Sequence, residues 1–60
     1  MYQTIKKGER VYLKMSDGWT YTGVFDGTEE KWGKTVLWLW IRGKKAAFIS
    51  DHLLDCGVVG

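Results

Sequence analysis

The segment Thr35–Arg42, with the sequence TVLWLWIR, is the longest apolar run in the chain and constrains its fold most. Its β-branched and aromatic residues favour a strand. Because side chains alternate along a strand, Val36, Trp38 and Trp40 share one face and the apolar residues between them share the other. We therefore expect a strand in the middle of a sheet, covered on both faces. Eight residues are too few for a membrane-spanning helix, which needs about 20.

The length of 60 residues predicts one domain, 1–60, in which Met1–Lys7 forms a polar lead-in or flexible arm. A chain of this size buries only about 60% of its unfolded surface, so its stability is marginal. Cys56 is the single cysteine, which excludes an intrachain disulfide, and one cysteine with one histidine does not make a zinc site. We expect no cofactor and no metal, which leaves association with a second copy or with a partner as the remaining support.

The net charge of +2 permits a nucleic-acid partner without requiring one. The segment Tyr2–Lys7 has no apolar run, so we expect no signal peptide. A single reduced cysteine is typical of proteins outside oxidising compartments. The sequence therefore predicts a cytoplasmic protein that is not inserted in a membrane.

Alternating apolar residues and the glycines between them predict an all-β chain without a long helix. Gly23 within a strand pattern indicates a bulge, a bend or a close backbone approach. We expect a tight turn at Ser16–Gly18, a polar loop at Asp26–Lys34, and a helical turn at Asp51–Leu54 that Asp51 caps. The five expected strands are Arg10–Met15, Trp19–Phe25, Thr35–Arg42, Lys45–Ser50 and Asp55–Val59. Five short strands with a helical turn before the last predict a small SH3-like barrel.

Two groups of residues resemble the motifs of the Sm-like superfamily. The first group, similar to the first Sm motif, is Val11-Tyr12-Leu13, Asp17-Gly18, Tyr21, Gly23 and Phe25-Asp26. The second group, similar to the second Sm motif, is Ile41-Arg42-Gly43 followed by Phe48-Ile49. The segment Ile49–Val58, with His52 and Leu54, is also similar to the end of the bacterial Hfq branch. The resemblance implies an Sm-like barrel that forms rings and binds RNA.

The sequence contains no recognisable catalytic set. A cysteine and a histidine form a nucleophile–base pair in some enzymes, and Cys56 lies four residues after His52. Neither residue lies in a glycine-rich elbow, so we interpret Cys56 as a small core residue and His52 as a turn residue. We expect a protein that is not an enzyme.

Exposed aromatic side chains beside cations are typical of surfaces that bind single-stranded nucleic acids, because bases stack on the rings. Trp32 lies in a polar segment that offers it nowhere to bury. Arg42, Lys44 and Lys45 bracket a turn, where they are able to neutralise phosphates. The candidate nucleic-acid-binding residues are Trp32, Arg42, Lys44, Lys45, Lys6 and Lys7. The predicted partner is RNA or single-stranded DNA.

The apolar face of Val36, Trp38 and Trp40 has three open interpretations: core, subunit interface or stacking platform. The surplus of apolar residues favours a homo-oligomer that uses this face or the last strand. A second function class also remains open, a protein-interaction module of the SH3-like type that binds a peptide or a partner protein through an aromatic face. The salt dependence of binding distinguishes the two classes, because only phosphate binding weakens steeply with salt.

Overall fold

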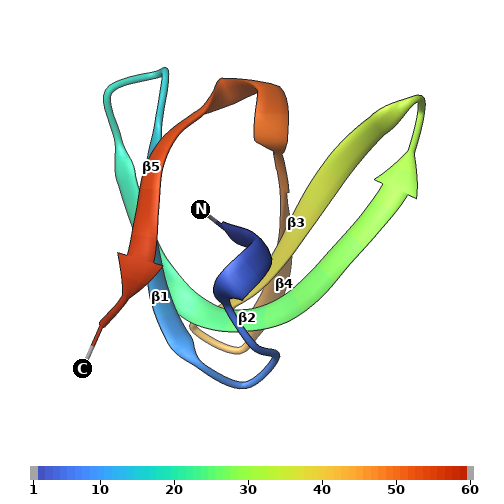
Figure 1. Cartoon of the computed structure of the whole chain (residues 1–60). Coiled ribbons are helices and arrows are strands. Elements are labelled where there is room, and N and C mark those ends of the chain that lie inside the picture. Colours follow the sequence, from blue (N-terminus) through green and yellow to red (C-terminus); the bar gives the residue numbers. More distant parts are fainter. Residues whose placement is uncertain (1, 60) are drawn as a thin grey trace.

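A computed structural model describes residues 2–59 of the chain. One antiparallel sheet of five strands has the order β4-β3-β2-β1-β5, and it curls strongly where β2 bends (Figure 1). The strands are β1 (Arg10–Met15), β2 (Thr20–Lys31), β3 (Lys34–Ile41), β4 (Lys44–Ile49) and β5 (Leu53–Val58). Two single-turn 3-10 helices, η1 (Tyr2–Thr4) and η2 (Ser50–His52), precede β1 and β5. The prediction of an all-β chain with a helical turn before the last strand is confirmed.

The sheet is open, because β4 and β5 are its two edge strands and do not pair with each other. The structure therefore does not confirm the closed barrel expected from the sequence. The central position of β3, between β2 and β4, is confirmed. No helix within residues 2–59 is long and apolar enough to cross a membrane.

The core lies on the inner face of the curled sheet, where alternate side chains of β1 and β3 meet. Val11, Leu13 and Met15 are buried, which confirms the alternation predicted for Arg10–Met15. Leu37 and Leu39 of β3 face them, and the cluster is completed by Phe25 and Ile5. Burying each of these side chains contributes about 1.5–3 kcal/mol, so this cluster is the main support of the fold.

The N-terminal segment before β1 is folded against this core rather than extended from it. Tyr2–Thr4 forms η1, and Ile5 is buried. The main-chain N–H of Gly8 donates to the carbonyl oxygen of Phe25 at 2.8 Å. Met1 and Gly60, which the predicted domain 1–60 includes, lie outside the described residues.

The predicted polar loop at Asp26–Lys34 is wrong, because these residues form a β-hairpin. β2 continues to Lys31, and β3 begins at Lys34 after a two-residue turn. Trp32 and Gly33 have φ values of 57° and 71°, as a type I′ turn requires at both of its central residues. Gly27, with φ 99°, lies at a register shift between Phe25 and Thr28, so a β-bulge accommodates the additional residue.

The last two elements begin earlier in the chain than expected. The helical turn predicted at Asp51–Leu54 is Ser50–His52, and the strand predicted at Asp55–Val59 is Leu53–Val58. Asp51 does not cap this turn, because the cap position is Ile49 and no side chain bonds there. The Asp51 carboxylate instead accepts a hydrogen bond from Lys34 Nζ at 2.8 Å.

Candidate nucleic-acid interface

A groove of about 760 Å³ lies between the first half of β2 and the β3–β4 turn. Its walls contain two arginines, one tryptophan and no carboxylate. The lining residues are Arg10, Thr20, Tyr21, Thr22, Gly23, Val24, Trp40, Ile41, Arg42 and Gly43. The groove therefore combines positive charge with an aromatic side chain.

The groove exists because β2 changes partners along its length. Thr20–Val24 pairs with β1, whereas pairing with β3 begins only at Val24. Between Thr20 and Gly23 one edge of the strand is consequently unpaired, and alternate main-chain groups point to that side. Gly23 brings the two strands close together where they meet, since an added Cβ would lie 2.5 Å from the Trp40 carbonyl oxygen. Of the three alternatives that the sequence left open at Gly23, a bulge, a bend or a close backbone approach, the structure shows the close approach.

One row of paired residues crosses four strands on the outer face of the sheet, the face opposite the core. Arg10 pairs with Val24, Val24 with Trp40, and Trp40 with Lys45. Because directly paired residues point to the same side of a sheet, Arg10 and Lys45 flank Trp40 at spacings set by neighbouring strands, about 4.8 Å per strand. The row places a 41% exposed tryptophan between two cations.

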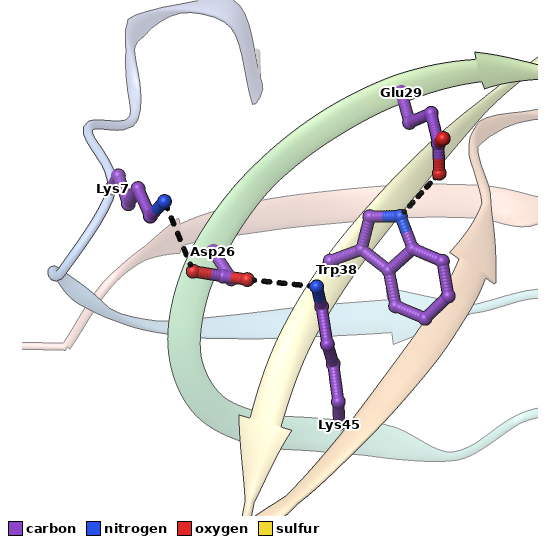
Figure 2. Close-up of polar contacts among 5 residues, drawn as sticks. All are labelled: Lys7, Asp26, Glu29, Trp38 and Lys45. Atoms are coloured by element: carbon purple, nitrogen blue, oxygen red, sulfur yellow. Dashed lines mark hydrogen bonds and ion pairs between the residues drawn. The ribbon is translucent and has the colours of Figure 1, made fainter.

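The two tryptophans of the outer face, Trp38 and Trp40, differ in their polar contacts and in their exposure. Trp38 Nε1 donates to Glu29 Oε1 at 3.1 Å, and Lys45 Nζ lies 4.9 Å from the centre of the Trp38 ring (Figure 2). The Trp40 side chain lies near Asp26 and contributes slightly to the lowered pKa of that carboxyl. The Trp38 ring is therefore partly occupied by Lys45, whereas Trp40 presents the more exposed ring.

The Asp26 carboxylate lies beside Trp40, and it is already paired with two lysines. Its two carboxylate oxygens lie 3.5 Å from Lys7 Nζ and 3.2 Å from Lys45 Nζ (Figure 2). The pKa of Asp26 is lowered, chiefly by the hydrogen bond from Lys45 and further by the charges of both lysines, while partial burial opposes the shift. The carboxylate thus stays ionised and compensates much of the charge of Lys7 and Lys45.

Replacing Asp26 with asparagine is expected to reduce stability at neutral pH but not in acid. A lowered folded-state pKa means that the ionised carboxylate stabilises the fold above the unfolded value of about 3.9, and that this contribution is lost as pH falls. We expect the wild type to unfold at a higher urea concentration than Asp26→Asn at neutral pH, and the two midpoints to converge at about pH 2. A constant difference across the pH range would contradict this role.

The structure divides the predicted nucleic-acid-binding residues between two ends of the sheet. Arg42 and Lys44 lie at the β3–β4 turn, beside the groove, and Lys45 belongs to the row described above. Trp32, 70% exposed, occupies the β2–β3 turn at the opposite end of β3, about 23 Å away along an eight-residue strand. Lys31 Nζ lies 4.8 Å from the centre of the Trp32 ring.

Lys6 and Lys7 lie in the loop between η1 and β1. Lys7 reaches the outer face through its ion pair with Asp26, whereas the Lys6 side chain is exposed. The Lys6 main-chain N–H donates to the carboxylate of Glu9 at 2.7 Å, which fixes this loop before β1 begins. Of these two lysines, Lys7 is therefore the one that forms an ion pair with a residue of the sheet.

The predicted interface residues differ in how much surface they offer. Val36 is fully buried within the chain, so it offers no surface to a second subunit. Trp38 is half-buried and Trp40 is exposed. Of the interpretations left open for this face, core therefore applies to Val36, whereas a subunit interface at Trp38 and Trp40 stays a prediction.

Arg10 lines the groove but was not among the nucleic-acid-binding residues predicted from the sequence. It belongs to a small basic group with Lys6 and Lys7 in the sequence, yet it lies 32 positions from Arg42. Strand alternation places Arg10 on the outer face of β1, and the β1–β2 register then brings it beside Val24. Only the pairing register, which a sequence does not fix, connects it with Trp40.

Comparisons with protein-family models, curated proteins and solved structures find no match to this chain. Within residues 2–59 no three histidine, cysteine, aspartate or glutamate side chains are placed to hold a metal ion. His52 is exposed in η2, and Cys56 packs against the core with its pKa raised, mainly by burial.

Proposed function

We propose that this chain is an Sm-like barrel domain that binds single-stranded nucleic acid, RNA or DNA, in the groove between β2 and the β3–β4 turn. Arg10 and Arg42 neutralise phosphates, and one base stacks on Trp40. Lys44 and Lys45 extend the cationic surface along the turn and β4. The curled five-stranded sheet and the Ile41-Arg42-Gly43 resemblance support the assignment to small Sm-like barrels.

The cross-strand row carries this proposal, because it places the exposed Trp40 ring between the cations Arg10 and Lys45. No ion pair described for residues 2–59 involves Arg10 or Arg42, so both guanidinium groups are available to a phosphate. No carboxylate lines the groove, and Asp26 beside Trp40 is paired with Lys7 and Lys45, which reduces its repulsion of a phosphate. Unpaired main-chain groups of Thr20–Gly23 add donors and acceptors for base edges or phosphates.

Trp40→Ala is expected to weaken binding of a short oligonucleotide by about 1–3 kcal/mol, the usual value of one stacked base. The slope of affinity against salt should stay nearly unchanged, because no charge is removed. Fluorescence anisotropy of a labelled strand of about four nucleotides, the lower end of single-strand site sizes, measures both quantities.

Trp32→Ala is the matched control for this measurement, since it removes a more exposed tryptophan about 23 Å away along β3. It should leave the affinity for the short strand unchanged and weaken only a strand of about sixteen nucleotides, long enough to reach the second turn. Equal losses for both variants on the short strand would contradict a binding site centred on Trp40.

We also propose that the protein is a homo-oligomer joined through its last strand. Leu54 and Val58 are exposed on β5, and β5 is an edge strand with unpaired main-chain groups. Light scattering should give a multiple of the chain mass at high micromolar concentration, and Leu54→Lys should shift it towards the monomer. A monomer mass for the wild type at every concentration would contradict the proposal.

A further inference from the structure

A second cavity, of about 360 Å³, lies between the β1–β2 turn and η2. Its walls come from inward-facing residues and from these two turns, and Tyr21 is the one residue that it shares with the groove. The residues that line it are Met15, Ser16, Asp17, Tyr21, Phe48 and His52. The main-chain N–H of Ser16 donates to the His52 carbonyl oxygen at 2.8 Å and thereby joins the two turns that form its rim.

Asp17 supplies a fixed negative charge at this rim. Its Oδ1 accepts from the main-chain N–H of Trp19 at 2.8 Å, and its Oδ2 accepts from the Tyr21 hydroxyl at 2.7 Å. These two hydrogen bonds, the Trp19 bond first, lower the pKa of Asp17 although some desolvation opposes them. No cation pairs with Asp17 among the ion pairs of residues 2–59, although the chain carries a net positive charge.

Aromatic rings form the wall next to this carboxylate. Tyr21 and Phe48 have ring centroids 4.9 Å apart and planes tilted by 50°. The faces of aromatic rings attract cations, and a planar guanidinium stacks on them while its N–H groups reach a carboxylate. Buried Met15 provides an apolar surface for the methylene groups of a long side chain.

We propose that this cavity binds an arginine side chain of a partner polypeptide. The guanidinium donates to the remaining lone pairs of the Asp17 carboxylate and stacks against the Tyr21–Phe48 pair. The charge of Asp17 excludes a phosphate, so this cavity and the groove take ligands of opposite charge. Trp19, 69% exposed on the same turn, offers further contact area to the polypeptide that carries the arginine.

The test is an NMR titration of the isotope-labelled full chain with a capped glycine–arginine–glycine peptide. The matched control peptide contains citrulline, which keeps the shape of the arginine side chain without its charge. A third peptide contains lysine, which is a point charge without a planar fork. We expect saturable shifts at Asp17, Tyr21 and Phe48, with at least about tenfold weaker binding of citrulline and weaker binding of lysine.

Two variants locate the site independently. Asp17→Asn retains an acceptor for the Trp19 N–H but removes the charge, and it should abolish the preference for arginine over citrulline. Phe48→Leu keeps an apolar wall and the charge but removes one aromatic ring. It should weaken arginine binding by about two- to tenfold, and unchanged binding would contradict stacking on this ring. If Asp17→Asn disturbs the amide spectrum of the free protein, the result for Phe48→Leu decides.

Equal affinity for the arginine and citrulline peptides overturns the proposal, and so does the absence of saturable shifts. Shifts that map to Arg10 and Trp40 instead of this cavity overturn it as well. Adding a short oligonucleotide to the same samples separates this proposal from the proposed function. The oligonucleotide should shift the signals of Arg10, Trp40 and Arg42 and leave those of Asp17 and Phe48 in place, whichever peptide is bound. Tyr21 lines both the groove and the cavity, so its signal does not separate the two sites.

Discussion

Gly23→Ala is expected to lower the free energy of unfolding by about 3 kcal/mol, the upper end of the cost of overpacking. An added Cβ would lie 2.5 Å from the carbonyl oxygen of Trp40 and 2.9 Å from Ile41 Cγ1. The carbonyl belongs to main chain that pairs with β2 at Val24, so relief requires the two strands to separate. A domain of 60 residues has only about 3–9 kcal/mol of stability, so at least about a third of it would be lost.

Gly57→Ala is the matched control for this prediction. Gly57 also lies within a strand, and its added Cβ would lie 2.8 Å from Cε2 of Tyr12, at the far end of a side chain. Because that ring is able to turn away, the expected loss is about 1 kcal/mol or less. Urea unfolding followed by circular dichroism measures both variants. Similar losses at the two glycines would show that the approach of Trp40 does not constrain β2.

The core was predictable because each of its strands alternates apolar and polar residues. Val11, Leu13 and Met15 are buried as their spacing indicates. A special backbone role for Gly23 was also predictable, because a glycine inside a strand indicates a bulge, a bend or a close backbone approach. Phe25, two residues later, is buried on the same side as Gly23. Periodicity was sufficient here because one side of the sheet is shielded from water.

The β2–β3 hairpin was not predictable from periodicity, because its residues are polar on both faces. Asp26–Lys34 contains four charged residues before Trp32, a composition typical of loops. Two local conformations make it a hairpin, the bulge at Gly27 and the turn at Trp32–Gly33. A tryptophan with positive φ is uncommon, so no propensity rule points to it.

The sequence predicted which types of residue form the candidate site, but only part of how they are arranged in space. Arg42, Lys44 and Lys45 are close in sequence, so their proximity follows from the turn between them. Arg10 and Trp40 are distant in sequence, and the pairing register across β1, β2 and β3 brings them to one row. Trp32 is exposed, as expected, but the length of β3 separates it from the groove.

The double variant Arg10→Gln with Arg42→Gln is expected to weaken binding of a short single strand on the order of 100-fold at low salt. Each arginine loses a charge-assisted hydrogen bond to phosphate, of about 1.5–3 kcal/mol. Glutamine keeps much of the side-chain length and some hydrogen bonding, so the loss reports charge. Both side chains are exposed, and neither belongs to the core, so the fold should persist.

The matched control removes two charges at the other end of β3, in the double variant Lys31→Gln with Lys34→Gln. It has the same net charge as the arginine variant, but neither lysine lines the groove. The exposed ion pair of Lys34 with Asp51 is lost, which costs little stability. Any effect of net charge alone will appear equally in both double variants.

The salt dependence of oligonucleotide binding by the wild type and these two double variants tests the central claim most directly. For a single strand, each neutralised phosphate contributes a slope of about −0.7 to log affinity against log salt. The arginine variant should therefore lose about 1.4 units of slope together with its affinity, whereas the lysine variant should keep a slope close to that of the wild type. A wild type that does not bind at low salt, or equal slopes for all three proteins, would contradict a nucleic-acid site at Arg10, Trp40 and Arg42.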